Sequence, residues 1–162
     1  ASNGVVTFSQ TPVGDNAGAI VQVVNVVTTD ATTTSTTIPH DDTIPQNNEG
    51  GEMFTLAITP TSASNKLLIL VNLQGACAGA QNELIVALFQ DSTADCLAAV
   101  SERQATQAQS NMSLSFQHFM TAGTTSATTF KVRAGSGGGN MTMNYNFSTG
   151  NTSGMTIMEI AV

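Results

Sequence analysis

Residues 112–118, MSLSFQH, decide the fold class. Apolar and polar side chains alternate along this stretch, and a period of two places successive side chains on opposite faces of an extended strand. The sequence therefore predicts a half-buried β-strand, whose apolar face carries Met112, Leu114, Phe116 and His118.

The same alternation recurs elsewhere in the chain. Turn-forming residues separate the alternating stretches, at 60–65, 122–126, 135–140 and 150–154. Thr, Val and Ile are frequent within the stretches, and β-branched side chains favour strands. About nine or ten strands at this spacing predict an all-β fold, an antiparallel β-sandwich of jelly-roll type. Further apolar faces are predicted at Phe54, Leu56 and Ile58; at Phe130, Val132 and Ala134; and at Met141, Met143, Tyr145 and Phe147.

Some predicted strands are apolar on both faces. Residues 67–71 (LLILV) and 84–89 (LIVALF) contain no polar side chain, and residues 20–27 are apolar in large part. One face of an antiparallel sandwich sheet usually meets water, so these strands need a second cover. We expect that cover to be another copy of the chain; burial under a long loop of the same chain is the alternative.

Charge is scarce in this protein. Asp, Glu, Lys and Arg make up 9% of the 162 residues, against roughly 25% in ordinary soluble domains, and the net charge is −7. Because phosphates need cationic partners, nucleic acids and anionic membrane surfaces are not expected to bind. The apolar runs are far shorter than the roughly 20 residues that cross a bilayer, so no membrane insertion is expected. The length favours one domain.

The inventory of catalytic groups is thin. No nucleophile elbow, phosphate loop, dinucleotide fingerprint or His-Glu-x-x-His motif occurs. His118 lies on the apolar face of its strand, where a structural histidine is the favoured interpretation. We expect no enzymatic activity and no cofactor. Cys77 and Cys96 are interpreted as small buried residues, with a disulfide between them as the alternative.

The densest polar cluster is residues 39–52, PHDDTIPQNNEGGE, which include four carboxylates. Hard cations such as calcium take oxygen ligands from such loops, which makes Asp41 and Asp42 candidate metal ligands. The cluster lacks the spacing of a dedicated calcium loop, and Asp and Asn also bond the backbone of tight turns. A structural turn is therefore favoured over a metal site.

Five segments of the chain share a family pattern, in the right order: 38–50, 56–69, 87–92, 121–135 and 155–160. They resemble the C-terminal domains of tailed-bacteriophage tail-fibre and related virion appendage proteins. The resemblance covers residues 19–162 and is most specific around Asp41, Asp42, Pro45 and Gln46. It implies a trimeric β-sandwich head that projects from a virion. Residues 1–18 are then an N-terminal arm or linking segment, and residues 19–162 a single sandwich domain.

The resemblance leads to two expectations for function. In the first, exposed polar loops of a homotrimer bind a bacterial surface glycan as host receptor, and the candidate loops are 101–111, 135–140 and 150–154. In the second, the protein is a capsid decoration, collar or fibre-shaft protein that contacts only other virion proteins. Both place it on the virion, assembled in the host cytoplasm and exposed on the extracellular particle.

Overall fold

The computed structural model describes residues 17–80, 82–104, 107–147 and 150–162. None of these residues forms a helix, and so none forms a helix long and apolar enough to cross a membrane. Ten strands are present in the described residues: β1 (Ile20–Thr28), β2 (Thr32–Thr34), β3 (Gly51–Ile58), β4 (Lys66–Cys77), β5 (Glu83–Gln90), β6 (Ala98–Arg103), β7 (Met112–Thr121), β8 (Thr128–Ser136), β9 (Met141–Met143) and β10 (Ser153–Ile160).

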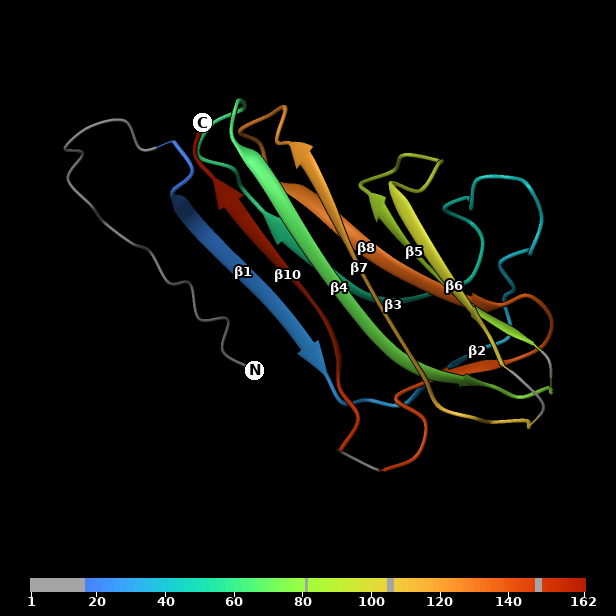
Figure 1. Ribbon diagram of the computed structural model, residues 1–162. Coiled ribbons are helices and arrows are strands. Elements are labelled where there is room, and N and C mark those ends of the chain that lie inside the picture. The colour runs from blue at the N-terminus through green and yellow to red at the C-terminus, as the bar shows by residue number, and fades with distance from the viewer. Residues whose placement is uncertain (1–16, 81, 105–106, 148–149) are drawn as a thin grey trace.

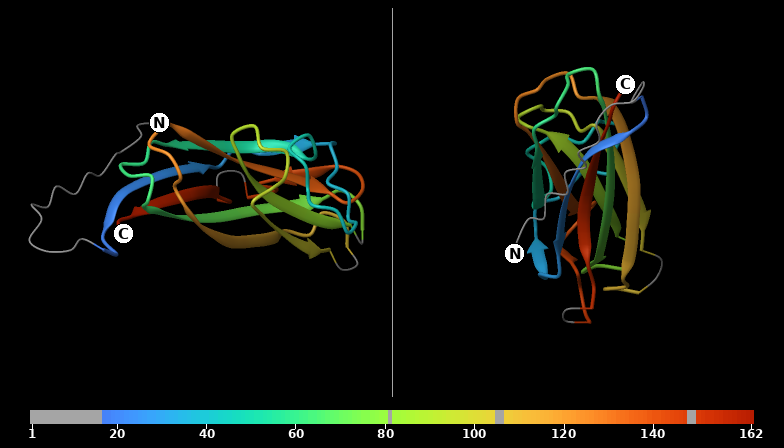
Figure 2. Two further views of the ribbon diagram at one scale, coloured as in Figure 1. Left: turned by 90° about the horizontal axis from the view of Figure 1, so that it is seen from above. Right: turned by 90° about the vertical axis from the view of Figure 1, so that its left-hand side faces the viewer.

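The strands form two antiparallel sheets. The large sheet has six strands in the order β1-β10-β4-β9-β2, with β7 paired to the other edge of β4. The small sheet has four strands in the order β3-β8-β5-β6. The two sheets are the layers of a sandwich, as Figure 2 shows from above and from the left-hand side of Figure 1. The predicted all-β antiparallel sandwich is confirmed.

The strand pairs are nested along the chain. β1 pairs with β10, β3 with β8, β4 with β7 and β5 with β6, so the outermost strands pair with each other and the innermost do likewise. This is the connectivity of a jelly roll. Loops between the main strands are therefore gathered at the two ends of the sandwich (Figure 1).

The core lies between the two sheets. Leu67, Ile69 and Val71 of β4 point inward and are at most 3% exposed. They face the small sheet, where the predicted apolar face of β8 is fully buried. Each such side chain contributes about 1.5–3 kcal/mol on burial. The predicted faces of β3, β7 and β8 are confirmed, because the period-two pattern is set by the strand itself.

One predicted strand ends early. β9 stops at Met143, whereas the alternation had predicted a strand through Phe147. Asn144, Asn146 and Phe147 have φ of 52°, 62° and 60°, which is the left-handed region and incompatible with a strand. Asn144 is held there by its buried amide, which donates to the carbonyl oxygens of Thr28 and Asp30 at 3.1 and 3.2 Å.

The two strands with apolar residues on both faces have different surroundings. On β5, the outward Ile85 and Phe89 are buried beneath Ile38, which belongs to the long connection between β2 and β3. We call residues 36–50 the covering loop. For β5 the loop alternative is thus the correct one. On β4, the outward Leu68 and Leu70 remain partly exposed.

The predicted N-terminal arm, residues 1–18, lies outside the described residues apart from Ala17 and Gly18. The Gly18 amide donates to the Ala161 carbonyl oxygen at 2.8 Å. The strands from β1 to β10 belong to one sandwich, and the boundary between arm and domain stays a prediction.

Candidate functional site

The covering loop is held against the small sheet by polar contacts. Arg133 of β8 donates to the carbonyl oxygens of Glu49 and Gly50, both at 2.7 Å. The Gln46 side chain donates to Asp95 Oδ1, in the turn between β5 and β6, at 2.8 Å. The loop is therefore fixed at both a strand and a turn of the sheet it covers.

Two glycines allow this close approach. A Cβ on Gly50 would lie 2.8 Å from the Ala134 carbonyl oxygen, and the φ of Gly50 is +63°, which disfavours other residues. A Cβ on Gly135 would lie 2.8 Å from the Ile38 amide nitrogen. Larger residues at either position would push the covering loop away from β8.

Asp41 stabilises a turn within the covering loop. Its Oδ1 accepts from the Thr43 amide at 2.8 Å and from the Thr43 hydroxyl at 2.5 Å. The Thr43 side-chain hydrogen bond, followed by the backbone one, lowers the pKa of Asp41 below its ordinary value. Among the described residues, no three His, Cys, Asp or Glu side chains gather as a metal cluster. The contacts of Asp41 agree with the structural turn that the sequence favours, and cation binding at Asp41 and Asp42 stays the untested alternative.

His40 lies between two small cavities at one end of the covering loop. Its Nδ1 is 2.9 Å from Glu83 Oε2, and the two side chains are 66% and 13% exposed. One cavity, of about 170 Å³, lies between the covering loop and β6 and includes Ile85 and Ser101 in its walls. The other, of about 200 Å³, is lined by His40, Asn82, Glu83, Arg103 and Gly137.

Two of the predicted binding loops meet beside these cavities. The Gln104 amide donates to the Asn82 carbonyl oxygen at 2.8 Å, and the Gly137 amide donates to the Glu83 carbonyl oxygen at 3.0 Å. These contacts bring the described parts of 101–111 and 135–140 to the start of β5. Ser101 to Arg103 belong to β6 rather than to a loop.

The third predicted loop, residues 150–154, is at the same end of the sandwich. The Asn72 side chain of β4 donates to the Thr152 carbonyl oxygen at 3.1 Å, and β10 begins at Ser153. Figure 1 shows this end, where β4 and β6 stop and β7 and β10 start. We call this end, with the described parts of 101–111, 135–140 and 150–154, the loop end.

Buried side-chain amides hold the loop end together. Gln104, 2% exposed, donates to the Gly79 carbonyl oxygen at 2.9 Å. Asn151, 7% exposed, donates to the Tyr145 carbonyl oxygen at 2.7 Å. Because buried amides are costly unless bonded, these contacts fix the loops in one arrangement. Sequence reasoning missed them, since the chain is rich in Asn and Gln and no local signal marks the buried ones.

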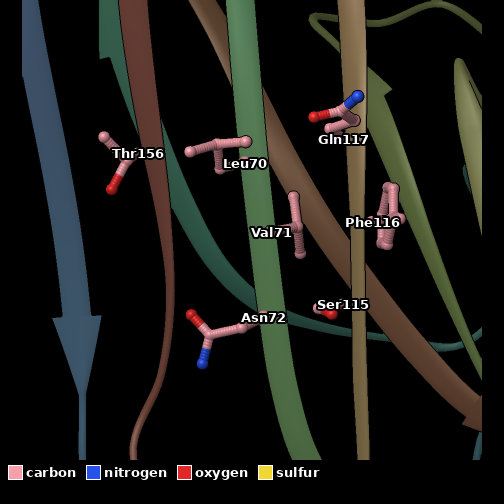
Figure 3. A pocket seen from close by; sticks show the side chains of 7 residues that line it. All are labelled: Leu70, Val71, Asn72, Ser115, Phe116, Gln117 and Thr156. Atoms are coloured by element: carbon pink, nitrogen blue, oxygen red, sulfur yellow. The ribbon is translucent and has the colours of Figure 1, made fainter.

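The outer face of the large sheet combines a shallow polar hollow with an apolar row. A shallow hollow of about 550 Å³ crosses β10, β4 and β7 and contains the polar side chains of Asn72, Gln117 and Thr156 (Figure 3). Next to it runs an apolar row across the sheet, in which paired residues come from four neighbouring strands. The row consists of Val23, Met158, Leu68 and Phe119.

His118, Cys77 and Cys96 have surroundings that fit a structural role. His118 lies opposite the buried Ile69, and burial lowers the pKa of the imidazole. Cys77 and Cys96 are free thiols, the first buried and the second partly exposed, so the disulfide alternative is not formed. Burial raises the pKa of both thiols, which keeps them in the unreactive protonated form.

No protein-family model and no curated protein matches the chain. Among solved structures, the Eiger TNF of S. frugiperda is similar, with a TM-score of 0.49, 11% identity and coverage of 86% of this chain and 93% of that one. The VP2 subviral particle protein of infectious bursal disease virus has a TM-score of 0.48 and 11% identity, covering 96% and 38%. The sugar-binding EclA C-terminal domain has a TM-score of 0.41 and 19% identity, covering 78% of each. Likenesses at this level assign no function to the chain.

Proposed function

We propose that this chain is the head domain of a bacteriophage tail fibre or related virion appendage and binds a bacterial surface glycan through its loop end. The observation that carries the glycan-binding part is the meeting of polar loops around two cavities, beside His40 and Glu83. The virion assignment rests on the family resemblance of residues 19–162.

The chemistry of the loop end suits sugars. Sugar hydroxyls need neutral hydrogen-bonding groups, and sugar ring C–H groups need apolar walls. In the cavities, Asn82 and Ser101 supply the hydrogen-bonding groups and Ile85 supplies an apolar wall. The loops are fixed by buried amides, so little conformational entropy is lost on binding. Several copies in one head would multiply a weak affinity by avidity.

We further propose that copies of the chain assemble as a homotrimer through the outer face of the large sheet. Among the described residues, no carboxylate points outward from β1, β10, β4 or β7, although the chain has eleven carboxylates and a net charge of −7. Like-charged copies repel least through such a face. Its apolar row, with Phe119 57% exposed, would then be covered.

The proposed function includes no catalysis. Glycoside hydrolysis generally uses two carboxyl groups on either side of the scissile bond. At the loop end Glu83 is engaged by His40 and Asp41 by Thr43, which favours binding over hydrolysis. Release of reducing ends from a bacterial polysaccharide by the purified protein would contradict this part of the proposal.

Adsorption tests the function directly. Purified protein, labelled with a fluorophore, is incubated with bacteria of the host strain and then challenged with phage. The proposal predicts that the protein adsorbs to the cells and competes with infection, and that stripping the surface polysaccharide removes both effects. Absence of adsorption and competition would contradict it.

The apolar row on the large sheet also favours the second candidate function, a capsid decoration, collar or fibre-shaft protein. A face of this kind can contact other virion proteins as well as other copies. This candidate predicts saturable binding to particles that lack the protein, without adsorption to cells. The two candidates thus give opposite results in the adsorption assay.

A further inference from the structure

We propose that the two cavities beside His40 are adjacent subsites for two linked sugar rings, with the imidazole between them. This inference rests on the proposed glycan-binding function and adds the location and the minimum length of the ligand. Each cavity, at about 170 and 200 Å³, is smaller than sites for drug-sized ligands, which start at roughly 300 Å³. One ring in each cavity, rather than one larger ligand in either, matches these volumes.

The imidazole is held in one orientation. A carboxylate can only accept hydrogen bonds, so the 2.9 Å contact with Glu83 places the proton of the neutral ring on Nδ1. Nε2 is then an acceptor for a sugar hydroxyl. Glu83 itself is partly buried, and its backbone carbonyl oxygen accepts from the Gly137 amide at 3.0 Å. His40 is therefore fixed to the sheet, although it belongs to the covering loop.

The cavity on the Ser101 side has an apolar wall and a polar rim. Ile85, 5% exposed, and Ala99 offer a surface for the C–H face of a sugar ring. Asp41 keeps Oδ2 as an acceptor because Oδ1 is bonded to Thr43. The Ser101 hydroxyl can both donate and accept, which suits a sugar hydroxyl.

The cavity on the Gly137 side is more polar. The Asn82 Nδ2 donates to the Gly138 carbonyl oxygen, which leaves the amide oxygen of Asn82 as an acceptor. Arg103 adds guanidinium donors, and it lies directly opposite Glu83 in the strand pair. This cavity thus offers both acceptors and donors, as the hydroxyls of a neutral sugar require.

The experiment uses the full chain and an array of purified bacterial surface polysaccharides. A disaccharide and the corresponding monosaccharide are then prepared from a polysaccharide that binds, and each is titrated into the protein with NMR detection. The inference predicts that the disaccharide shifts amide signals on both sides of His40, including Ser101 and Gly137. It should bind at least about tenfold more tightly than the monosaccharide, since two sets of hydrogen bonds are made.

Variants locate the binding. His40→Ala should weaken disaccharide binding about tenfold, and Ser101→Ala about threefold, in line with the loss of one or two hydrogen bonds. Ser126→Ala, an exposed serine in the turn before β8, is the matched control and should bind as the wild type does. Ser101 is exposed, so its variant keeps the fold even if His40→Ala loosens the covering loop.

Two contrary outcomes are distinguishable. A polysaccharide that binds wild type, His40→Ala and Ser101→Ala equally, or shifts signals only elsewhere, would contradict the subsites and leave the glycan-binding function standing. Failure to bind any polysaccharide, together with failure to adsorb to cells, would contradict the function and the subsites with it.

Discussion

At the scale of single residues, the most constrained polar group is Glu159 of β10. Its carboxylate is fully buried, and Oε1 accepts from the Thr61 amide and hydroxyl at 2.8 and 2.7 Å and from the Asn65 side chain at 2.7 Å. No cation takes part in these described contacts. The group ties the turn between β3 and β4 to β10 at the end of the sandwich opposite the loop end.

Replacing Glu159 by Ala should therefore destabilise the protein. The Asn65 side chain, which is 5% exposed, and the Thr61 amide would both lose their acceptor, and we expect a loss of about 3 kcal/mol in the free energy of unfolding. Glu102→Ala, at an exposed position on β6, is the control and should change stability by less than about 0.5 kcal/mol. Denaturant unfolding of the three proteins gives the comparison, and equal stabilities would refute a structural role for Glu159.

His118 makes stability depend on pH. Burial lowers its pKa in the folded state below the ordinary value of 6.5, so the unfolded chain binds the proton more readily. The folded state should consequently lose stability as the pH falls from about 7 through 6.5 and towards the lowered pKa. In His118→Leu this contribution is absent. The gap in melting temperature between variant and wild type should therefore change between pH 7 and pH 5, and a gap that stays constant would show that His118 does not titrate differently on folding.

At the scale of elements, the covering loop sets this sandwich apart from a plain pair of sheets. It buries the outward apolar side chains of β5 beneath Ile38 and brings His40 to Glu83. The same element therefore stabilises the small sheet and builds the wall between the two cavities. Its glycine contacts with β8 explain how a loop can lie so close to a strand.

Ile38→Ala tests the packing of the covering loop. Ile38 is fully buried, and its truncation should cost about 2–4 kcal/mol of stability through lost burial and a cavity. Ile44→Ala in the same loop removes a side chain that is 55% exposed and should cost less than about 0.5 kcal/mol. Limited proteolysis should also cut the loop faster in Ile38→Ala. If the two variants unfold alike, the loop is not packed on β5.

The sequence allowed the strands to be predicted better than their surroundings. Alternation at 112–118 and 130–134 is local, so each face could be assigned without knowledge of its partner. The apolarity of 84–89 showed that a cover was needed but could not identify it, because a loop and a second copy require the same side chains. The contact between His40 and Glu83 and the burial of Gln104 depend on strand order, which no local pattern encodes.

Across the whole molecule, the few charged side chains are distributed unevenly. The described carboxylates lie on loops, on the small sheet or, for Glu159, in the interior. Among the residues that the structure describes, Lys66 is the one charged side chain on the outer face of the large sheet, and it lies at the margin. A chain of net charge −7 thus keeps one broad face neutral and partly apolar while its loop end is polar. We propose that the outer face of the large sheet binds other copies and that the loop end binds the glycan.

Phe119→Glu should separate the copies. Phe119 is 57% exposed in the single chain, so a Glu at this position leaves the fold intact but places a charge in the proposed interface. Sedimentation equilibrium should give three times 16.7 kDa for the wild type and a single chain for the variant. Thr125→Glu, in the exposed turn between β7 and β8, adds the same charge elsewhere and should remain assembled. A wild type that stays monomeric at micromolar concentration would argue against the interface.

We propose that one face of the sandwich joins copies and that one end is free to bind a receptor. Electron cryomicroscopy of the intact particle tests both parts in a single map. We expect three copies related by an axis, with the apolar row of the large sheet buried between them and the loop end pointing away from the particle. A map with the loop end buried against another virion protein, or with the outer face of the large sheet open to solvent, would contradict it.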